Sequence, residues 1–455
     1  MSTYGLVDPM SIASNTNFKY WRFEYKNTSN AILPIRTQAY NYNMEVGQQP
    51  GTDLEAVAGG VSANKSEPNG ALSAGAGLIK KTLLVDMIDQ HIIVHDASET
   101  EGMNSGHTYF TARSGAPVVV LSKGDVNNNG LGMVVNGGFQ VQLKSDAYAE
   151  NDHDCRVTEA YDMTEKTNGY GNGMTYLLDR PMQPTTRSLY NVLFKDPEHY
   201  SEFYNLCMTS FPEEDLILLG LKKEDMSKEE WTAEQNKYRI FTNASGFNPA
   251  QGEQLIRFFN NYRYTVYAPT NTALQNAYSL GLPTYDDIHN FIEGAKIPDP
   301  DNEGEYTMTP EDQEKGVAML NMLVNFVKYH FQDESFYVDS NVPEEDDYQT
   351  SCIDNEENLY IELHMKRGND GSIVVTGKDG ASANVIAPFN VLARDANFDN
   401  SPAKGAYSFK NTSFVVVHQI DNVLNFKTME GGRYDAAWAT PKKARAFNNK
   451  YGIRK

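Results

Sequence analysis

Apolar residues in the first half of the chain change from helical spacing to strand-like alternation. In residues 78–95 they recur every three or four positions, which predicts a helix with one buried face. Further along they alternate with polar residues in short runs separated by Gly, Asn and Asp, which is typical of strands joined by turns. The predicted strands are residues 109–113, 117–121, 132–135, 139–143 and 175–178.

The second half repeats this order of helices followed by strands. The expected helices are residues 187–210 (interrupted at Pro197), 222–235 and 271–279, and the expected strands are residues 264–268, 359–365, 373–376, 384–387 and 414–420. A stretch rich in Pro, Asp and Glu at 297–315 is expected to be a surface insertion. Helices followed by short strands, twice over, indicate an α+β fold in which antiparallel strands form a sandwich against which the helices pack.

One helical segment occurs in two similar copies. The later copy, NMLVNFVKYH, ends at His330, and the earlier copy, TLLVDMIDQH, ends at His91. Each is followed by a short apolar strand that ends in an aspartate, with 88 residues from His91 to Asp179 and 91 residues from His330 to Asp421. Two different motifs in the same order at nearly the same spacing predict an internal duplication.

The segment YTVYAPTNTA in the second unit resembles the signature of the fasciclin (FAS1) domain. In that family a strand ends at an Ala-Pro-Thr turn that opens a helix, and Ala268, Pro269 and Thr270 match the turn. The pattern makes physical sense, because Pro269 ends the strand and either Thr270 or Asn271 can cap the helix that follows.

Two further segments of the second unit resemble motifs of the same family. FVKYH, which ends in Tyr329 and His330, is similar to the tyrosine-histidine motif at the end of the family's central helix. SFVVVHQIDNVL, which contains Asp421, is similar to its closing strand. The three motifs stand in the family's order and cover roughly residues 187–426, so together they are specific where each alone is weak.

The first unit matches the same motifs less well. His91 and Asp179 keep their places, but Gln90 stands where the motif has tyrosine. The Ala-Pro-Thr signature has a counterpart in AILPIRTQA, where Pro34 stands at the place of Pro269. Only some thirty residues precede this counterpart. We therefore expect a divergent or incomplete FAS1 domain in this part of the chain.

The resulting fold prediction is α+β, with two FAS1-like domains that are each an antiparallel β-sandwich or wedge with packed helices. The divergent domain is assigned to residues 1–184 and the second domain to residues 185–428. Residues 429–455 are predicted to form a basic tail beyond the last domain, because residues 441–455 carry six Lys or Arg and no acidic residue. The tail is expected to be solvated, or else to dock on an acidic partner.

The two motif histidines are candidates for catalysis, but a histidine at a helix end more often bonds to nearby backbone. In the family they resemble, His91 and His330 are expected to be structural, as are the other motif residues. His91 and His95 also have the spacing of two zinc ligands on a helix, yet no third ligand suggests itself. The sequence lacks the GxSxG, P-loop and GxGxxG patterns, so no catalytic, cofactor or metal site is predicted and the protein is not expected to be an enzyme.

Two acidic loops have a partial likeness to calcium-binding loops. DVNNNG, from Asp125, and DPDNEG, from Asp299, have oxygen-bearing side chains at the first, third and fifth positions and glycine at the sixth. At the twelfth position, where a bidentate glutamate is needed, they have Asn136 and Pro310. Turn formation between strands explains both loops without a metal.

Composition narrows the classes of partner. The net charge of −21 argues against nucleic acid or an anionic membrane as the main partner. The three cysteines are widely spaced, which excludes a disulfide framework and favours buried apolar packing. No apolar run approaches ~18 residues, so no transmembrane helix is expected. The first seventeen residues lack the features of a signal peptide, so the protein is either cytoplasmic or exported by a signal outside this sequence.

The family resemblance implies a non-catalytic extracellular binding protein that acts in adhesion or as a subunit of a surface complex. The acidic, Tyr- and Asn-rich composition and the degenerate repeat resemble surface lipoproteins of Bacteroidota, which implies an outer-membrane location through a lipid anchor outside the sequence given. The expected partners are other surface proteins, including a SusC/SusD-type importer. A glycan-binding accessory role is the alternative, with Tyr20, Trp21 and Tyr25 as candidate contacts. An enzyme with an unrecognised concave site is the third reading.

Overall fold

A computed structural model describes most of the second half of the chain and several parts of the first. The described residues are 89–93, 103, 108–138, 154–162, 173–180, 182, 185, 187–242, 255–256, 263–338, 345–398, 409–426, 433–434 and 440–452. Most of the helix expected at 78–95, the strand expected at 139–143, and the candidates Tyr20, Trp21, Tyr25, Pro34 and His95 lie outside these residues.

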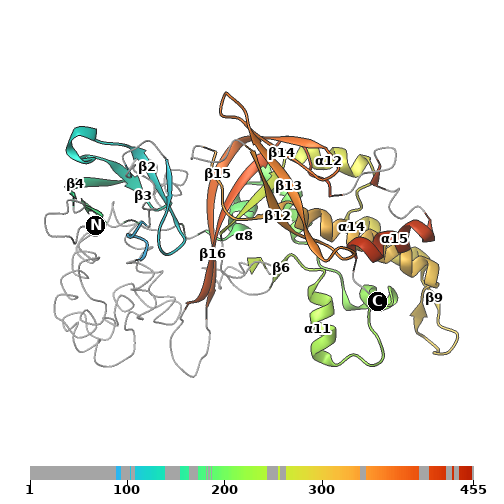
Figure 1. Cartoon of the computed structure of the whole chain (residues 1–455). Coiled ribbons are helices and arrows are strands. Elements are labelled where there is room, and N and C mark those ends of the chain that lie inside the picture. The colour runs from blue at the N-terminus through green and yellow to red at the C-terminus, as the bar shows by residue number, and fades with distance from the viewer. Residues whose placement is uncertain are drawn as a thin grey trace, which may run out of the picture.

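The first half contributes a five-stranded antiparallel sheet in which each strand pairs with the next along the chain (Figure 1). The strands are β1 (Tyr109–Thr111), β2 (Pro117–Ser122), β3 (Val134–Asn136), β4 (Cys155–Asp162) and β5 (Met174–Leu178). A short 3₁₀ helix, η2 (Val126–Asn128), lies in the β2–β3 connection. One face of the sheet is apolar and encloses a small core that includes Val118, Met133 and Val157. The alternation in the sequence predicted four of these strands, whereas β4 was missed because its exposed positions are charged.

Seven strands of the second half close into a barrel (Figure 1). In the order in which they pair they are β11 (Phe331–Asp333), β12 (Glu345–Asp354), β13 (Leu359–Arg367), β14 (Ile373–Thr376), β15 (Ser382–Phe398), β16 (Phe409–Ile420) and β8 (Arg263–Pro269). Neighbouring strands are antiparallel except β16 and β8, which run parallel. The α+β class is confirmed, but the expected sandwich is wrong here, because β8 pairs with both β16 and β11 and closes the sheet.

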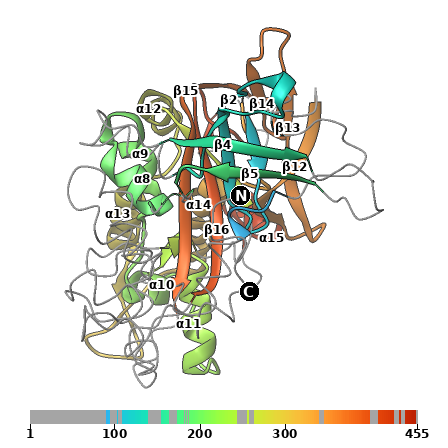
Figure 2. The same ribbon diagram turned by 90° about the vertical axis from the view of Figure 1, so that its left-hand side faces the viewer.

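Eight helices of the described residues accompany the barrel, and Figure 2 shows most of them on one side of β15 and β16. They are α8 (Leu189–Lys195), α9 (Pro197–Cys207), α10 (Glu213–Leu218), α11 (Lys228–Asn236), α12 (Asn271–Ser279), α13 (Tyr285–Ala295), α14 (Pro310–Tyr329) and α15 (Pro441–Tyr451). None of the helices in this part of the chain combines the length and apolar character that a bilayer-spanning segment needs. The break expected near Pro197 is confirmed, because Asp196 ends α8 and caps α9, and Pro197 occupies the first turn of α9.

Two short hairpins complete the described elements. Strands β6 (Phe241–Thr242) and β7 (Leu255–Ile256) pair beside α8, and β9 (Ile297–Pro298) pairs with β10 (Tyr306–Thr307). The expected insertion at 297–315 is therefore the β9–β10 hairpin followed by the start of α14. Thr309 caps α14, with its hydroxyl accepting a hydrogen bond from the backbone of Asp312, and Pro310 occupies the first turn.

The central helix α14 is buried along most of its length and packs against α15. The expectation of a tail beyond the last domain is wrong for residues 441–451, which form α15. This helix is basic on its outer face, but Ala444, Phe447 and Tyr451 are buried in the same core as α14. The division of the chain at residues 184 and 428 stays a prediction.

The five-stranded sheet also contacts the barrel. The rings of Tyr109 on β1 and Tyr337 after β11 are stacked, with centroids 4.2 Å apart and planes inclined by 4°. Val119 of β2 packs with Tyr337 and with Leu392 of β15 in a small apolar cluster. Apolar contacts therefore join the described parts of the two halves.

Candidate functional site

The Ala-Pro-Thr turn lies where β8 ends and α12 begins. The Thr270 hydroxyl accepts a hydrogen bond from the backbone of Ala273 (3.2 Å), so Thr270 caps α12. The backbone N–H of Thr270 donates to the carbonyl oxygen of Ile420 (2.9 Å), which extends the parallel pairing of β8 with β16. Ala268 is fully buried, and Pro269 is the last residue of the strand.

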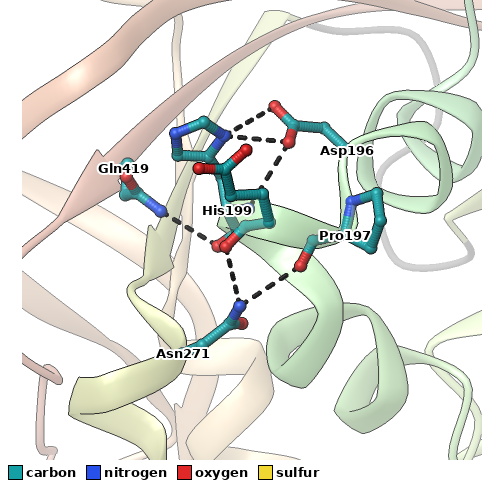
Figure 3. A network of polar contacts seen from close by, with 6 residues as sticks. Asp196, Pro197, His199, Asn271 and Gln419 are labelled. Carbon is teal, nitrogen blue, oxygen red and sulfur yellow. Dashed lines mark hydrogen bonds and ion pairs between the residues drawn. The ribbon is translucent and has the colours of Figure 1, made fainter.

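Two amide side chains fasten the start of α9 to this turn (Figure 3). Asn271 Nδ2 donates to the carbonyl oxygens of Pro197 (3.2 Å) and Glu198 (2.9 Å). Gln419, on β16, donates through Nε2 to the carbonyl oxygen of His199 (2.9 Å). The turn therefore positions an exposed histidine, His199, at the edge of the barrel.

His199 is held by the carboxylate that caps its own helix. Nδ1 of His199 lies 2.8 and 2.9 Å from the two carboxylate oxygens of Asp196 (Figure 3). The His199 side chain is 36% exposed. An aspartate that orients an imidazole is one part of a general-base arrangement. Among the described residues, however, no hydroxyl or thiol is hydrogen-bonded to the His199 ring, so the pair lacks a nucleophile.

Two other exposed histidines are held in the same way. His289 of α13 bonds through Nδ1 to Asp215 of α10, and His364 of β13 bonds through Nδ1 to Asp347 of β12, both at 2.8 Å. The hydrogen bond to Asp215 raises the pKa of His289 above its usual value. Each pair joins two neighbouring elements, which gives it a clear structural use.

Tyr329, at the end of α14, makes two hydrogen bonds to backbone. Its hydroxyl donates to the carbonyl oxygen of Glu362 (2.7 Å) and accepts from the N–H of Lys378 (2.9 Å). It therefore connects the helix to β13 and to the turn between β14 and β15. Burial raises the pKa of Tyr329 well above its usual value.

His330 is fully buried and satisfied by backbone on both nitrogens. Nδ1 donates to the carbonyl oxygen of Phe326 (2.8 Å), and Nε2 accepts from the N–H of Leu424 (3.1 Å). Because Nε2 is an acceptor, the ring must be neutral. Burial lowers the pKa of His330 to about 4. These contacts are those of a structural residue, as the family resemblance implies.

The first half repeats the His330 contact with His91. Nε2 of His91 accepts from the N–H of Met182 (2.9 Å), and Met182 stands at the place of Leu424 when the two aspartates are aligned. Gln90, at the place of Tyr329, accepts from the hydroxyl of Ser114 through Oε1 (3.0 Å) and so also bonds to the neighbouring turn.

The two motif aspartates also make the same contacts. Asp179 Oδ1 accepts from the N–H of Arg156 (2.8 Å), and the N–H of Asp179 donates back to the carbonyl oxygen of Arg156 (2.9 Å). Asp421 makes the same two bonds with Asn384, at 2.7 and 3.1 Å. These matched contacts are the geometry that an internal duplication would produce.

The three cysteines and His418 are also buried inside the protein. Cys155, Cys207 and Cys352 are buried free thiols, and burial raises the pKa of Cys352 to about 12. Burial also raises the pKa of Cys207, so Cys207 and Cys352 are protonated at neutral pH, which suits packing rather than nucleophilic attack. His418 is also fully buried, and burial lowers its pKa to about 4.

A buried carboxylate on β15, Asp395, went unnoticed in the sequence. It accepts hydrogen bonds from the N–H of Leu189 at the start of α8 (2.9 Å) and from the hydroxyl of Tyr264 (3.0 Å). A third, longer bond comes from the N–H of Ile256 (3.4 Å). Burial raises the pKa of Asp395 to about 6. Asp395 therefore ties β15 to a helix, to β7 and to β8, and no sequence pattern around it points to this position.

The two acidic loops use their carboxylates to form turns. Asp125 Oδ1 accepts from the N–H of Asn127 (3.0 Å). The two carboxylate oxygens of Asp299 accept from the N–H of Asp301 (2.8 Å) and the side chain of Asn302 (3.1 Å). Within the described ranges, no group of three or more His, Cys, Asp or Glu could hold a metal ion.

Large apolar side chains are exposed at the ends of hairpins. At the β12–β13 end, Ile353 is 39%, Leu359 63% and Tyr360 50% exposed, and Ile353 lies directly opposite Tyr360. We call these three residues the hairpin tip. Leu121, near the end of β2, and Val126, in the β2–β3 connection, are similarly exposed. Period-two alternation could have revealed the tip, because three consecutive apolar residues at 359–361 break it.

Comparisons with known proteins find likenesses among solved structures. No protein-family model matches the chain, and no curated protein matches it. A solved structure with a likeness to it is a FAS1 domain pair from the insect cell adhesion molecule fasciclin I. The two chains are 11% identical, and the likeness covers 90% of this chain and 96% of the other with a TM-score of 0.24.

Proposed function

We propose that this protein is a non-catalytic extracellular binding protein that acts through protein–protein contacts, and that the hairpin tip is one of its contact surfaces. The observation that carries the proposal is the exposure of Ile353 and Tyr360, which are cross-strand partners on one face of the hairpin, with Leu359 exposed at the same end. Exposed apolar groups that lie together mark interaction sites in soluble proteins more often than scattered ones do.

The hairpin tip is held in place by α15, which favours binding with little loss of conformational freedom. The N–H of Asn355, in the turn, donates to the carbonyl oxygen of Lys450 (2.7 Å), and its side chain also bonds to the carbonyl oxygen of Gly452. The ammonium of Lys450 lies 3.4 Å from the buried carboxylate of Asp354. A loop anchored in this way presents its apolar side chains in one arrangement.

The charges beside the hairpin tip indicate the partner's chemistry. Glu356 and Glu357 are exposed in the same turn. A complementary partner surface would be apolar with Lys or Arg at its rim. Other cell-surface proteins are the partners we propose, with a SusC/SusD-type importer of the outer membrane among them.

A non-catalytic role is supported by how the described histidines and cysteines are used. His91, His330 and His418 bond to backbone inside the protein. His199 and His289 are held by aspartates without a bonded nucleophile. These contacts are the ones that structural histidines make, which supports a non-catalytic role.

The test is affinity recovery of the tagged full-length protein from its native membranes in mild detergent, with mass spectrometry. We expect a surface protein in stable ratio to the bait, and its loss when Leu359→Ser and Tyr360→Ser are combined. The matched control is Ile297→Ser on the β9–β10 hairpin, a side chain of similar exposure (44%), which should keep the partner. Recovery of the bait alone, or equal recovery with both variants, would overturn the proposal. Protease treatment of intact cells tests the extracellular location.

A glycan-binding role is the second candidate, and an aromatic pair on α8 favours it. The rings of Tyr190 and Phe194 have centroids 6.0 Å apart and are nearly parallel, with planes inclined by 14°, and Phe194 is 56% exposed. The hydroxyl of Tyr204 donates to that of Tyr190 (3.1 Å) beside them. Flat aromatic surfaces with nearby hydroxyls suit stacking against sugar rings. Loss of binding on a glycan array for Phe194→Ala, with Ile217→Ala as the exposed control, would support this role.

A further inference from the structure

A pocket of about 180 Å³ lies among α14, α15, α11 and the loop after α10. Its apolar lining comes from Leu219, Leu221, Met226 and Val317. A cavity of about 150 Å³ lined by apolar side chains holds a molecule the size of benzene. This pocket therefore has room for a small organic group with an apolar body.

Two buried carboxylates, Glu314 of α14 and Glu234 of α11, also line the pocket, and they are only 9% and 7% exposed. Glu314 accepts from Arg445 through Oε1 (2.7 and 3.2 Å), and Glu234 accepts from Lys237 through Oε2 (2.7 Å). The second oxygen of each carboxylate makes no hydrogen bond within the described residues. The second carboxylate oxygens of Glu314 and Glu234 are both accessible to solvent. Each carboxylate thus keeps an acceptor available to a ligand.

The cations that pair with these two carboxylates are more exposed to solvent than the carboxylates are. The Arg445 side chain is 69% exposed and that of Lys237 is 45% exposed, whereas the two glutamate side chains are at most 12% exposed. The exposed side chains of Arg445 and Lys223 also line the pocket, so its charges balance, but the two carboxylates lie deeper than these cations and beside the apolar lining. A carboxylate removed from water favours a cationic partner more strongly than one on the surface does.

We propose that this pocket binds a compact primary amine with an apolar body. Its ammonium group donates to the second oxygen of Glu314, with Glu234 adding a further acceptor, and its apolar body packs on Leu219 and Val317. An ammonium group suits the pocket because it carries three donors and requires no fixed coordination shell. The inference does not depend on the proposed protein–protein function, since the hairpin tip contributes no residue to the pocket.

The test is titration of the purified full-length protein with two probes of nearly the same shape. Leucinamide carries the amine and a branched apolar body, and 4-methylpentanamide has the same body without the amine. We expect saturable calorimetric binding and a rise in melting temperature with leucinamide only, since a ligand that binds only the folded state stabilises it. Equal binding of both probes, or no saturable binding of leucinamide up to about 100 mM, overturns the proposal; that limit corresponds to an interaction too weak to discriminate ligands.

Variants connect the binding to the pocket. Glu314→Gln should weaken leucinamide binding by about tenfold or more, because a charge-assisted hydrogen bond is lost. The matched control is Glu311→Gln, on the exposed first turn of the same helix, which should bind as the natural protein does. Asn449→Trp, at an exposed position of the lining, should block the pocket without removing a buried group, and it decides the matter if Glu314→Gln fails to fold. Full binding by Asn449→Trp, or equal loss in Glu314→Gln and Glu311→Gln, would refute the assignment.

Discussion

Acid should destabilise this protein through its buried histidines, and His418 allows the effect to be isolated. Nε2 of His418 donates to the carbonyl oxygen of Phe336 (3.1 Å), and Nδ1 accepts from the N–H of Asn390 (3.3 Å). The ring is fully buried and neutral, and burial lowers its pKa to about 4, as it does for His330. In an unfolded chain both would titrate near 6.5.

The direction of the effect follows from these values. A histidine whose folded pKa is depressed contributes stability above pH 6.5 and loses it as the pH falls toward 4, because the unfolded state then binds the proton more readily. Each histidine should lose roughly 3 kcal/mol between pH 7 and pH 4. Asp395 acts in the opposite direction, because its raised pKa of about 6 restores roughly 2 kcal/mol as the pH falls. The net loss from the three groups is on the order of 4 kcal/mol.

The assay is urea unfolding at pH 7 and at pH 4, followed by intrinsic fluorescence. His418→Gln keeps a side-chain amide donor for Phe336 but cannot be protonated, so we expect its acid-induced loss to be smaller than that of the natural protein by about 3 kcal/mol. Tyr329→Phe, which removes a buried hydrogen-bonding group that does not titrate between pH 7 and pH 4, is the control and should lose as much stability on acidification as the natural protein does. If His418→Gln and the natural protein lost the same amount of stability, the buried neutral ring would be refuted as a source of the acid sensitivity.

Three other substitutions test the contacts that hold the barrel and its helices together. Phe447→Ala should cost roughly 3–5 kcal/mol and expose the C-terminal segment to limited proteolysis, because a fully buried ring of α15 is removed from the core. Tyr329→Phe should cost roughly 1–3 kcal/mol in urea unfolding, because the N–H of Lys378 and the carbonyl oxygen of Glu362 lose their shared partner. Thr270→Ala should cost roughly 1 kcal/mol as a lost helix cap, and an unchanged unfolding midpoint would contradict the cap.

Much of the secondary structure could be predicted from the sequence, because local signals were strong there. The helix expected at 271–279 is α12, with the same ends, since Pro269 stops the strand and Thr270 caps the helix. The strand at 373–376 is β14, also with the same ends. At these positions the spacing of apolar residues and the turn residues predicted the same element, and tertiary contacts did not change its ends.

The elements that the sequence analysis missed depend on contacts between residues far apart in the chain. Strand β12 begins EDDY, and its outward positions are acidic because they face solvent and pair with basic residues of β13, such as Lys366 with Glu345. Helix α15 looked like a tail because six of its eleven residues are Lys, Arg or Asn, yet Phe447 and Tyr451 are buried in the same core as α14. Barrel closure depends on the pairing of β8 with β16, whose residues are some 150 positions apart.

The candidate functional site could likewise be predicted only in part from the sequence. The motif residues Tyr329 and His330 could be located in sequence, but their bonds to backbone atoms more than thirty residues away could not. The exposed Asp196–His199 pair had a local signal, since an aspartate before proline with histidine three positions on is a helix-capping arrangement. The pocket between α11, α14 and α15 had none, because it exists only once α15 has packed.

The repeated histidine contact is compatible with the predicted duplication even though the two halves share few residues. His91 and His330 both accept from a backbone N–H, that of Met182 and that of Leu424. A bond to backbone places no demand on the side chain of the donor residue, so methionine and leucine serve equally well there. The acceptor must be a neutral imidazole at the end of its helix, and this is the residue that both halves retain. A repeat held together by side-chain-to-backbone bonds can therefore diverge at most positions while the histidine and the aspartate keep their spacing.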